Sequence, residues 1–130
     1  NDTLLQNDDT LLFAVAANEN WQFELYVTYT DASAAGVADL KFTMVGPAGS
    51  TLNWGALHLS STDVLALSDK KAGAETLVAG GNATERQVKI CGTIANGGTA
   101  GNCTLQWAQN VADVSNLLVK ANSYLIARRF

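Results

Sequence analysis

The sequence predicts an all-β domain, an antiparallel sandwich or jelly roll of about eight strands with little helix. Apolar and polar residues alternate with period two in several short runs, and Gly, Asn or Pro residues bound these runs. The runs recur at spacings of about eight to twelve residues, with no long helical pattern between them. These observations disfavour a parallel α/β sheet, because its successive strands are joined by crossover helices.

Length and charge limit the domain organisation and the class of partner. A chain of 130 residues has the size of one domain, and 48% apolar residues with 15% charged residues supply a core. We expect residues 1–10 to form an N-terminal arm or edge strand and residues 11–130 to form a single β domain. The net charge of −4 argues against nucleic acid and anionic membrane surfaces as partners. No apolar run has the length of a membrane-spanning helix.

The clearest alternation predicts a half-buried strand over residues 21–30. Its apolar face would carry Trp21, Phe23, Leu25, Val27 and Tyr29. The other predicted strands include an early strand at 11–16, weaker alternation at 40–44, clearer runs at 88–94 and 103–107, and a closing strand at 124–130.

Two turns are predicted between these strands. Gly46-Pro47-Ala48-Gly49 is typical of a tight turn, because proline presets φ and glycine allows positive φ. Asn96-Gly97-Gly98 predicts a hairpin apex for a related reason. The segment 60–81 is less periodic, and residues 62–68 are compatible with a short helical turn or with a loop and an irregular edge strand.

The two cysteines lie at equal distances in sequence from Gly97. A hairpin that turns at this glycine would set Cys91 opposite Cys103, and a non-hydrogen-bonded pair comes closest to disulfide geometry. We therefore predict a disulfide, which implies an oxidising compartment or an extracellular particle. The alternative is a pair of buried thiols that act as small hydrophobic residues.

The supply of catalytic residues is small. His58 is the only histidine and lies among apolar residues, so a hydrogen-bonded strand position explains it better than a base or metal ligand. Asp8, Asp9, Glu24 and Asp39 could in principle serve a two-carboxylate glycosidase, but turn and solvent-face positions explain them better. We expect a protein that is not an enzyme and has no cofactor. We expect no metal site either, because no zinc-binding or calcium-binding spacing is present.

Aromatic and apolar residues outside the predicted core are candidates for an interface. Trp21 and Trp107 fall on the apolar sides of their strands, whereas Trp54 and Tyr26 are predicted to lie at the surface. We expect Trp54 and Tyr26 to anchor an interface, and a glycan is a further possible ligand for such aromatic rings. The predicted arm is polar except for Leu4 and Leu5, which could add a strand to a neighbour.

Four groups of residues share a pattern, namely 11–25, 39–42 together with Gly46-Pro47-Ala48-Gly49 and Trp54, 101–110, and 122–129. Together they resemble a family of small virion proteins of tailed bacteriophages. The resemblance runs through nearly the whole chain, and 105–110, Leu-Gln-Trp-Ala-Gln-Asn, is its most specific part. The sequence departs from the family pattern at Cys91 and Cys103, where apolar residues are usual, and at Asn122, where glycine is commoner.

The resemblance implies a non-enzymatic structural component of a virion, of the capsid-decoration or tail-fibre type. Such a protein associates with copies of itself, with a trimer expected, and docks on a major capsid or tail protein. Two alternatives remain open from the sequence. One is a carbohydrate-binding module, and the other is a secreted filament subunit that assembles by strand exchange.

Overall fold

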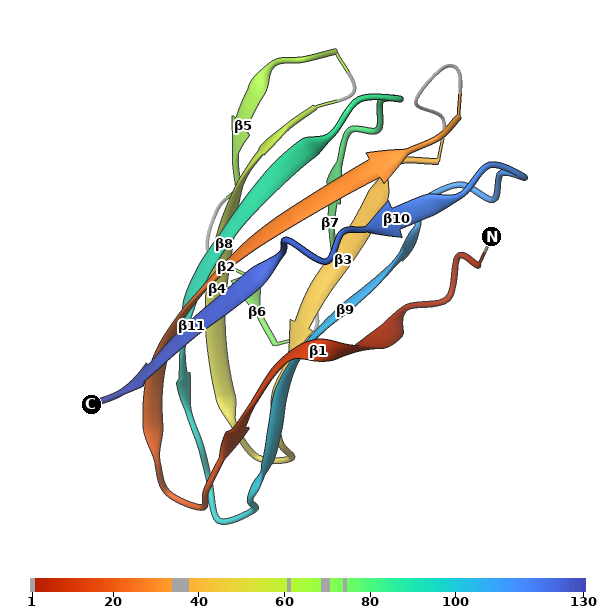
Figure 1. Cartoon of the computed structure of the whole chain (residues 1–130). Helices are drawn as coiled ribbons and strands as arrows, with labels where there is room; N and C mark the ends of the chain where they lie inside the picture. The colour runs from red at the N-terminus through yellow and green to blue at the C-terminus, as the bar shows by residue number, and fades with distance from the viewer. Residues whose placement is uncertain (1, 34–37, 61, 69–70, 74) are drawn as a thin grey trace.

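The computed structural model describes residues 2–33, 38–60, 62–68, 71–73 and 75–130. Within these residues the chain forms a β sandwich of two antiparallel sheets with eleven strands and no helix (Figure 1). The predicted all-β fold class is therefore confirmed, with short strands at 65–67, 71–72 and 77–79 in the segment of weak periodicity. The strands are β1 Gln6–Val15, β2 Asn20–Asp31, β3 Leu40–Val45, β4 Thr51–Leu59, β5 Leu65–Leu67, β6 Lys71–Ala72, β7 Leu77–Ala79, β8 Arg86–Ala95, β9 Gly101–Gln109, β10 Leu117–Val119 and β11 Tyr124–Arg129.

The strand pairing is nested. The smaller sheet has the order β1-β9-β3-β7, and the larger sheet has the order β10-β2-β8-β4-β5, with β11 also on β2 and β6 on β4. Strand β1 pairs with β9, β2 with β8, β3 with β7 and β4 with β5. Along the sequence, each of these pairs therefore lies inside the one before it, from the distant pair β1 and β9 to the adjacent pair β4 and β5. Most connections between successive strands therefore cross from one sheet to the other, as in Greek-key sandwiches.

This topology overturns the predicted hairpin at Asn96-Gly97-Gly98. Strand β8 pairs with β2 and β4, whereas β9 pairs with β1 and β3 in the opposite sheet. The turn is instead bound to the connection between β1 and β2 at the lower end of Figure 1. Asn18 N donates to Gly97 O over 2.8 Å, and Asn96 N donates to Glu19 O over 2.8 Å. These bonds fasten one crossing connection to another.

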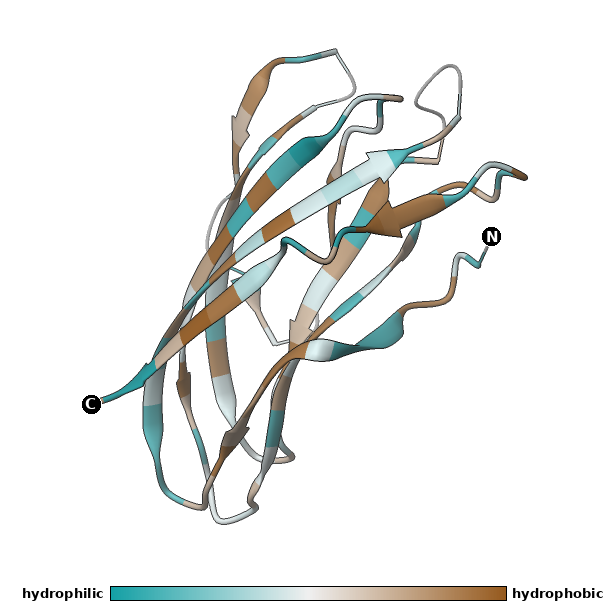
Figure 2. Cartoon of the chain, viewed as in Figure 1, coloured by the Kyte–Doolittle hydropathy of each residue, from teal (hydrophilic) through white to brown (hydrophobic). Residues whose placement is uncertain are grey.

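The core between the sheets follows the alternation seen in the sequence, which Figure 2 displays as bands of opposite hydropathy along the strands. On β2, Phe23, Leu25, Val27 and Tyr29 are buried, as predicted. Burial of such side chains is the main favourable contribution to folding. Other buried apolar residues are Leu11, Val15, Leu40, Phe42, Met44, Leu52, Trp54, Ala56, Ala79, Val88, Ile90, Ile94, Cys103, Leu105 and Leu117.

One glycine makes room for two of the large rings in this core. Gly92 is the register partner of Phe23 on one side and of Trp54 on the other. A Cβ atom at Gly92 would lie 2.6 Å from Cζ of Phe23 and 2.8 Å from Cβ of Trp54. The missing side chain therefore lets both rings occupy the inner face of the larger sheet.

Candidate functional site

The outer face of the larger sheet carries a row of side chains from five neighbouring strands. Register partners run across the sheet from β11 to β5, and side chains of register partners project from the same face. Three members are large and exposed: Tyr124 at 50%, Leu57 at 40% and Leu67 at 81%. We call this the outer-face row, and its members in order are Tyr124, Tyr26, Lys89, Leu57 and Leu67.

The centre of the outer-face row is held by an aromatic pair and an ion pair. The rings of Tyr26 and Tyr124 stack with centroids 4.7 Å apart, and Lys89 Nζ lies 5.1 Å from the Tyr26 centroid. Lys89 Nζ also lies 3.0 Å from Glu24 Oε2, which accepts a hydrogen bond from Tyr26 Oη over 2.9 Å. The side chains of Tyr26 and Lys89 are therefore ordered by each other and by Glu24.

The charges at this centre stabilise each other. Hydrogen bonds from Lys89 and Tyr26 lower the pKa of Glu24, and contacts with Tyr26 and Glu24 raise the pKa of Lys89. Both groups are therefore ionised at neutral pH, and their charges cancel. The outer-face row thus presents apolar groups at both ends and a neutral ion pair in the middle.

Further apolar side chains extend the outer-face row at both ends. Leu65 on β5 is 65% exposed, and Val64 beside it is 62% exposed. Ile126 on β11 lies two residues from Tyr124 on the same face and is 57% exposed. The outer face of a sandwich sheet ordinarily carries polar residues, so exposed apolar residues on neighbouring strands mark this face as a candidate interaction surface.

The N-terminal segment lies against its own domain. From Gln6 onward it belongs to β1, the edge strand of the smaller sheet that pairs with β9. Asp2 O accepts a hydrogen bond from Gln109 N over 3.0 Å, and the ammonium of Lys41 donates to Thr3 O. Leu4, a predicted interface residue, is 70% exposed. Leu5, the other one in this segment, is only partly buried.

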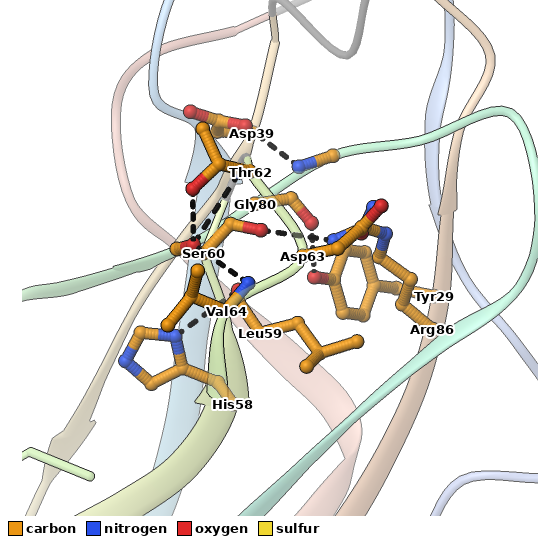
Figure 3. A network of polar contacts seen from close by, with 11 residues as sticks. Tyr29, Asp39, His58, Leu59, Ser60, Thr62, Asp63, Val64, Gly80 and Arg86 are labelled. Atoms are coloured by element: carbon orange, nitrogen blue, oxygen red, sulfur yellow. Dashed lines mark hydrogen bonds and ion pairs between the residues drawn. The ribbon is translucent and has the colours of Figure 1, made fainter. Parts of the chain in front are cut away.

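A polar network joins the connections that follow β4 and β7, at the end of the sandwich opposite the Gly97 turn (Figure 3). Arg86 is 6% exposed, donates from Nη1 to Ser60 O over 3.0 Å and forms an ion pair with Asp63. Tyr29 Oη donates to Gly80 O over 2.6 Å. These bonds satisfy buried polar groups and hold the connections that follow β4 and β7. The network therefore has a structural role and is not a candidate catalytic site.

The structure corrects the position of Trp54. Its side chain belongs to the inner face of β4 and is 2% exposed, with Phe42 at a ring centroid distance of 6.0 Å. The prediction of a surface anchor is therefore wrong. Leu52, Ala56 and His58 share this buried face of β4, so the alternation around Trp54 already carried the signal.

The structure also corrects the predicted disulfide. Cys91 lies on β8 in the larger sheet and is exposed, whereas Cys103 lies on β9 in the smaller sheet and is fully buried. Both thiols are free, because the two strands belong to opposite sheets and a bond needs adjacent Cα atoms. The alternative prediction was that both thiols are buried. Only Cys103 is buried, and Cys91 is exposed.

The candidate catalytic residues lie in separate parts of the fold. His58 is 8% exposed on the inner face of β4, with its ring nearly perpendicular to the ring of Phe42. Glu24 lies on the outer face of β2, where it binds Tyr26 and Lys89. Asp8 and Asp9 lie in an irregular part of β1. The structure does not bring His58 together with any of these carboxylates.

Two further findings concern the described part of the chain. These residues contain no group of three or more His, Cys, Asp or Glu side chains that could hold a metal ion. They also contain no helix long and apolar enough to cross a membrane.

Sequence reasoning identified Tyr26 but missed most of the outer-face row. The alternation of β4 and β8 places Leu57 and Lys89 opposite the core, so their outward orientation could have been read from the sequence. Their position beside Tyr26 and Tyr124 depends on the strand order, which the alternation does not contain.

Comparison of the chain with models of protein families, with curated proteins and with solved structures finds no match.

Proposed function

We propose that this chain is a non-enzymatic structural component of a viral particle that works by self-association and by docking on a major capsid or tail protein. The observation that carries the assembly role is the outer-face row, where Tyr124, Leu57 and Leu67 expose apolar surface on one sheet face. Apolar side chains exposed on neighbouring strands mark interaction sites, because their contact with water is unfavourable. The virion setting is supported by the resemblance of the sequence to phage virion proteins.

The arrangement of the row suits a protein interface. Tyrosine pairs are frequent anchors in interfaces, because they bury a large area and lose little side-chain entropy. Tyr26 and Tyr124 already restrain each other by stacking, which reduces the ordering cost of binding. The Lys89–Glu24 pair is neutral overall, so the row can approach a second copy without charge repulsion.

The distribution of polar groups supports a role without catalysis. The buried charges of the network at Arg86 are paired or hydrogen-bonded within the fold. His58, the only histidine, has its Nδ1 atom 3.3 Å from the Leu59 carbonyl oxygen. A general acid and base need mutual reach, which His58 and Glu24 lack on opposite faces of the sheet.

Strand exchange is the weaker form of assembly. Residues Gln6 and Asn7 pair with Trp107 and Gln106 of the same chain. An N-terminal strand donated to a neighbour would have to break these pairs first, which costs part of the binding free energy. Association through the outer-face row needs no such rearrangement.

Sedimentation equilibrium over a wide range of protein concentration tests the self-association. We expect a closed oligomer, with a trimer as the first expectation. The double variant Leu57→Gln/Leu67→Gln should raise the concentration of half-association at least about tenfold. Val78→Thr is the matched control, because Val78 is an exposed apolar residue of the smaller sheet, at 38%. A monomer at all concentrations, or an equal effect of both variants, would contradict the assembly surface.

Electron microscopy with an antibody raised against this chain tests the virion setting separately. Label on a capsid lattice or on a tail would support the proposal. Label confined to headless filaments would instead favour a secreted filament, and particles from the source that bind no antibody would reject the virion role.

A further inference from the structure

A groove of about 410 Å³ opens between the N-terminal segment and β9, away from the outer-face row. Its walls include Leu4 and Asp9 from the N-terminal side and Trp107 from β9, and Leu117 of β10 also reaches it. This volume is in the range of small-molecule sites. The outer-face row and the polar network at Arg86 do not contribute to it.

An irregularity in β1 creates the groove. The register pairs Asn7 with Gln106 but resumes only at Leu12 with Thr104, so β1 has extra residues at this point. Asp8 Oδ1 accepts hydrogen bonds from Thr10 N over 2.9 Å and from Leu11 N over 2.8 Å. The bulge is therefore ordered by the chain itself before any ligand arrives.

Trp107 forms a fixed wall of the groove. Its Nε1 donates a hydrogen bond to Asp8 Oδ2 over 3.1 Å, and the partly buried ring packs against the core. Burial works to raise the pKa of Asp8, but hydrogen bonds from Leu11, Thr10 and Trp107 outweigh it and lower the pKa. The carboxylate is thus ionised at neutral pH and holds the indole in place.

The groups around the groove define the chemistry of a ligand. Among the described residues, the lining contains the carboxylates of Asp2, Asp8 and Asp9 and no Lys, Arg or His, so phosphate and other anions are unfavourable. Asn7 Oδ1 already accepts from Gln106 Nε2 over 2.8 Å, which leaves the Asn7 amide hydrogens for a ligand oxygen. The Asp9 carboxylate is exposed and offers acceptors for hydroxyl groups.

We propose that this groove binds a neutral saccharide. A pyranose presents a C–H face to apolar groups such as Trp107 and Leu4, and its hydroxyls both donate and accept hydrogen bonds. Asp9 would accept from these hydroxyls, and the amide of Asn7 would donate to them. An ammonium group on an aliphatic stem could use the carboxylates but has no acceptor for the Asn7 amide, which favours the sugar.

The test uses ¹H–¹⁵N spectra of the full chain titrated separately with glucose, galactose, mannose, N-acetylglucosamine and cellobiose. We expect at least one sugar to shift the Nε1–H signal of Trp107, with a Kd of about 1 mM, and to leave the buried Trp54 signal in place. Asp9→Ala should weaken this binding at least about tenfold. Glu85→Ala is the matched control, because it removes an exposed carboxylate from the connection between β7 and β8.

Three outcomes would overturn the saccharide site. The first is that none of the five sugars moves the Trp107 signal at concentrations up to about 10 mM. The second is that Asp9→Ala binds the sugar as well as the Glu85→Ala control does. The third is that Nα-acetyl-lysine amide moves the Trp107 signal and the sugars do not, which would assign the groove to a cationic side chain. A change in oligomeric state alone bears on the outer-face row and not on this groove.

Discussion

The indole of Trp54 donates a hydrogen bond from Nε1 to the carbonyl oxygen of Gly73 over 3.0 Å. Trp54 lies on β4, and Gly73 directly follows β6, the short strand that pairs with Trp54 and its neighbour Asn53. The ring therefore both fills the core and fastens the segment that passes from the larger sheet to the smaller one. This relationship makes Trp54 a residue of stability rather than of association.

Replacement of Trp54 should accordingly unfold the domain more easily. We expect Trp54→Ala to lower the free energy of unfolding by about 3–5 kcal/mol, because it leaves a cavity and an unpaired Gly73 carbonyl. Urea unfolding measured by circular dichroism checks the value, with the exposed Val111→Ala as a control close to wild type. If Trp54→Ala left the unfolding curve unchanged but abolished the oligomers, Trp54 would be an interface residue and not a core residue.

A methyl group at Gly92 should also destabilise the core. A Cβ there would lie 2.6 Å from both Phe23 Cζ and the Asn53 carbonyl oxygen, so neighbouring groups must move. We expect Gly92→Ala to cost about 1–3 kcal/mol of unfolding free energy in thermal or urea denaturation. Gly98→Ala is the matched control, since no atom lies within 4 Å of the corresponding Cβ position. Equal stability of the two variants would show that the rings have more room than the structure gives them.

The two thiols should differ sharply in reactivity. Burial raises the pKa of Cys103 to about 12, whereas Cys91 is exposed. Because the thiolate is the reactive form, we expect iodoacetamide to modify one cysteine in the native protein and two after unfolding in guanidinium chloride. Intact mass and peptide mapping identify the sites. If the native protein takes up no label and its mass is lower by two hydrogens, Cys91 and Cys103 form the disulfide after all.

Tyr29 should make the fold sensitive to alkali. Burial raises the pKa of its hydroxyl above the ordinary value of 10.0. A folded pKa above the unfolded one means that this contribution is complete below about pH 10 and is lost as pH rises toward the folded pKa. At pH 7, Tyr29→Phe should lower the free energy of unfolding by about 1 kcal/mol, because it removes the hydrogen bond to Gly80 O. Above pH 10, the variant should lose less further stability than the wild type does. If the wild type and Tyr29→Phe lost equal stability as the pH rose above 10, this assignment would be contradicted.

Asp8 should contribute stability that disappears in acid. Its folded pKa lies below the ordinary value of 3.8, so its contribution is present above about pH 3.8 and is lost as pH falls through the lower folded pKa. We expect Asp8→Asn to cost about 1 kcal/mol at pH 7, a modest value because the site is partly exposed to solvent, and little below pH 3. Urea unfolding at both pH values measures the difference, with Asp9→Asn as the neighbouring control. A deficit for Asp8→Asn that persisted unchanged in acid would point to the shape of the bulge and not to its charge.

The sequence alone predicted which faces of several strands are buried. Phe23, Leu25 and Val27 lie inward as their alternation indicates, since side chains on a strand alternate between faces whatever the strand pairs with. A turn also forms at the Gly-Pro-Ala-Gly segment but one residue later than predicted, over residues 47–50, with Ser50 N donating to Pro47 O over 3.1 Å. Of the alternatives for residues 62–68, the structure contains the short edge strand β5.

The choice of partners was decided only by the tertiary structure. Residues on both sides of Gly97 have the pattern of a hairpin, yet β8 and β9 enter opposite sheets and separate Cys91 from Cys103. The same long-range pairing places Tyr26 between Tyr124 and Lys89, from strands far apart in the sequence. Alternation is a local property of one strand. Pairing depends on which strands together bury the most apolar surface and satisfy their backbone hydrogen bonds, and the whole chain determines that.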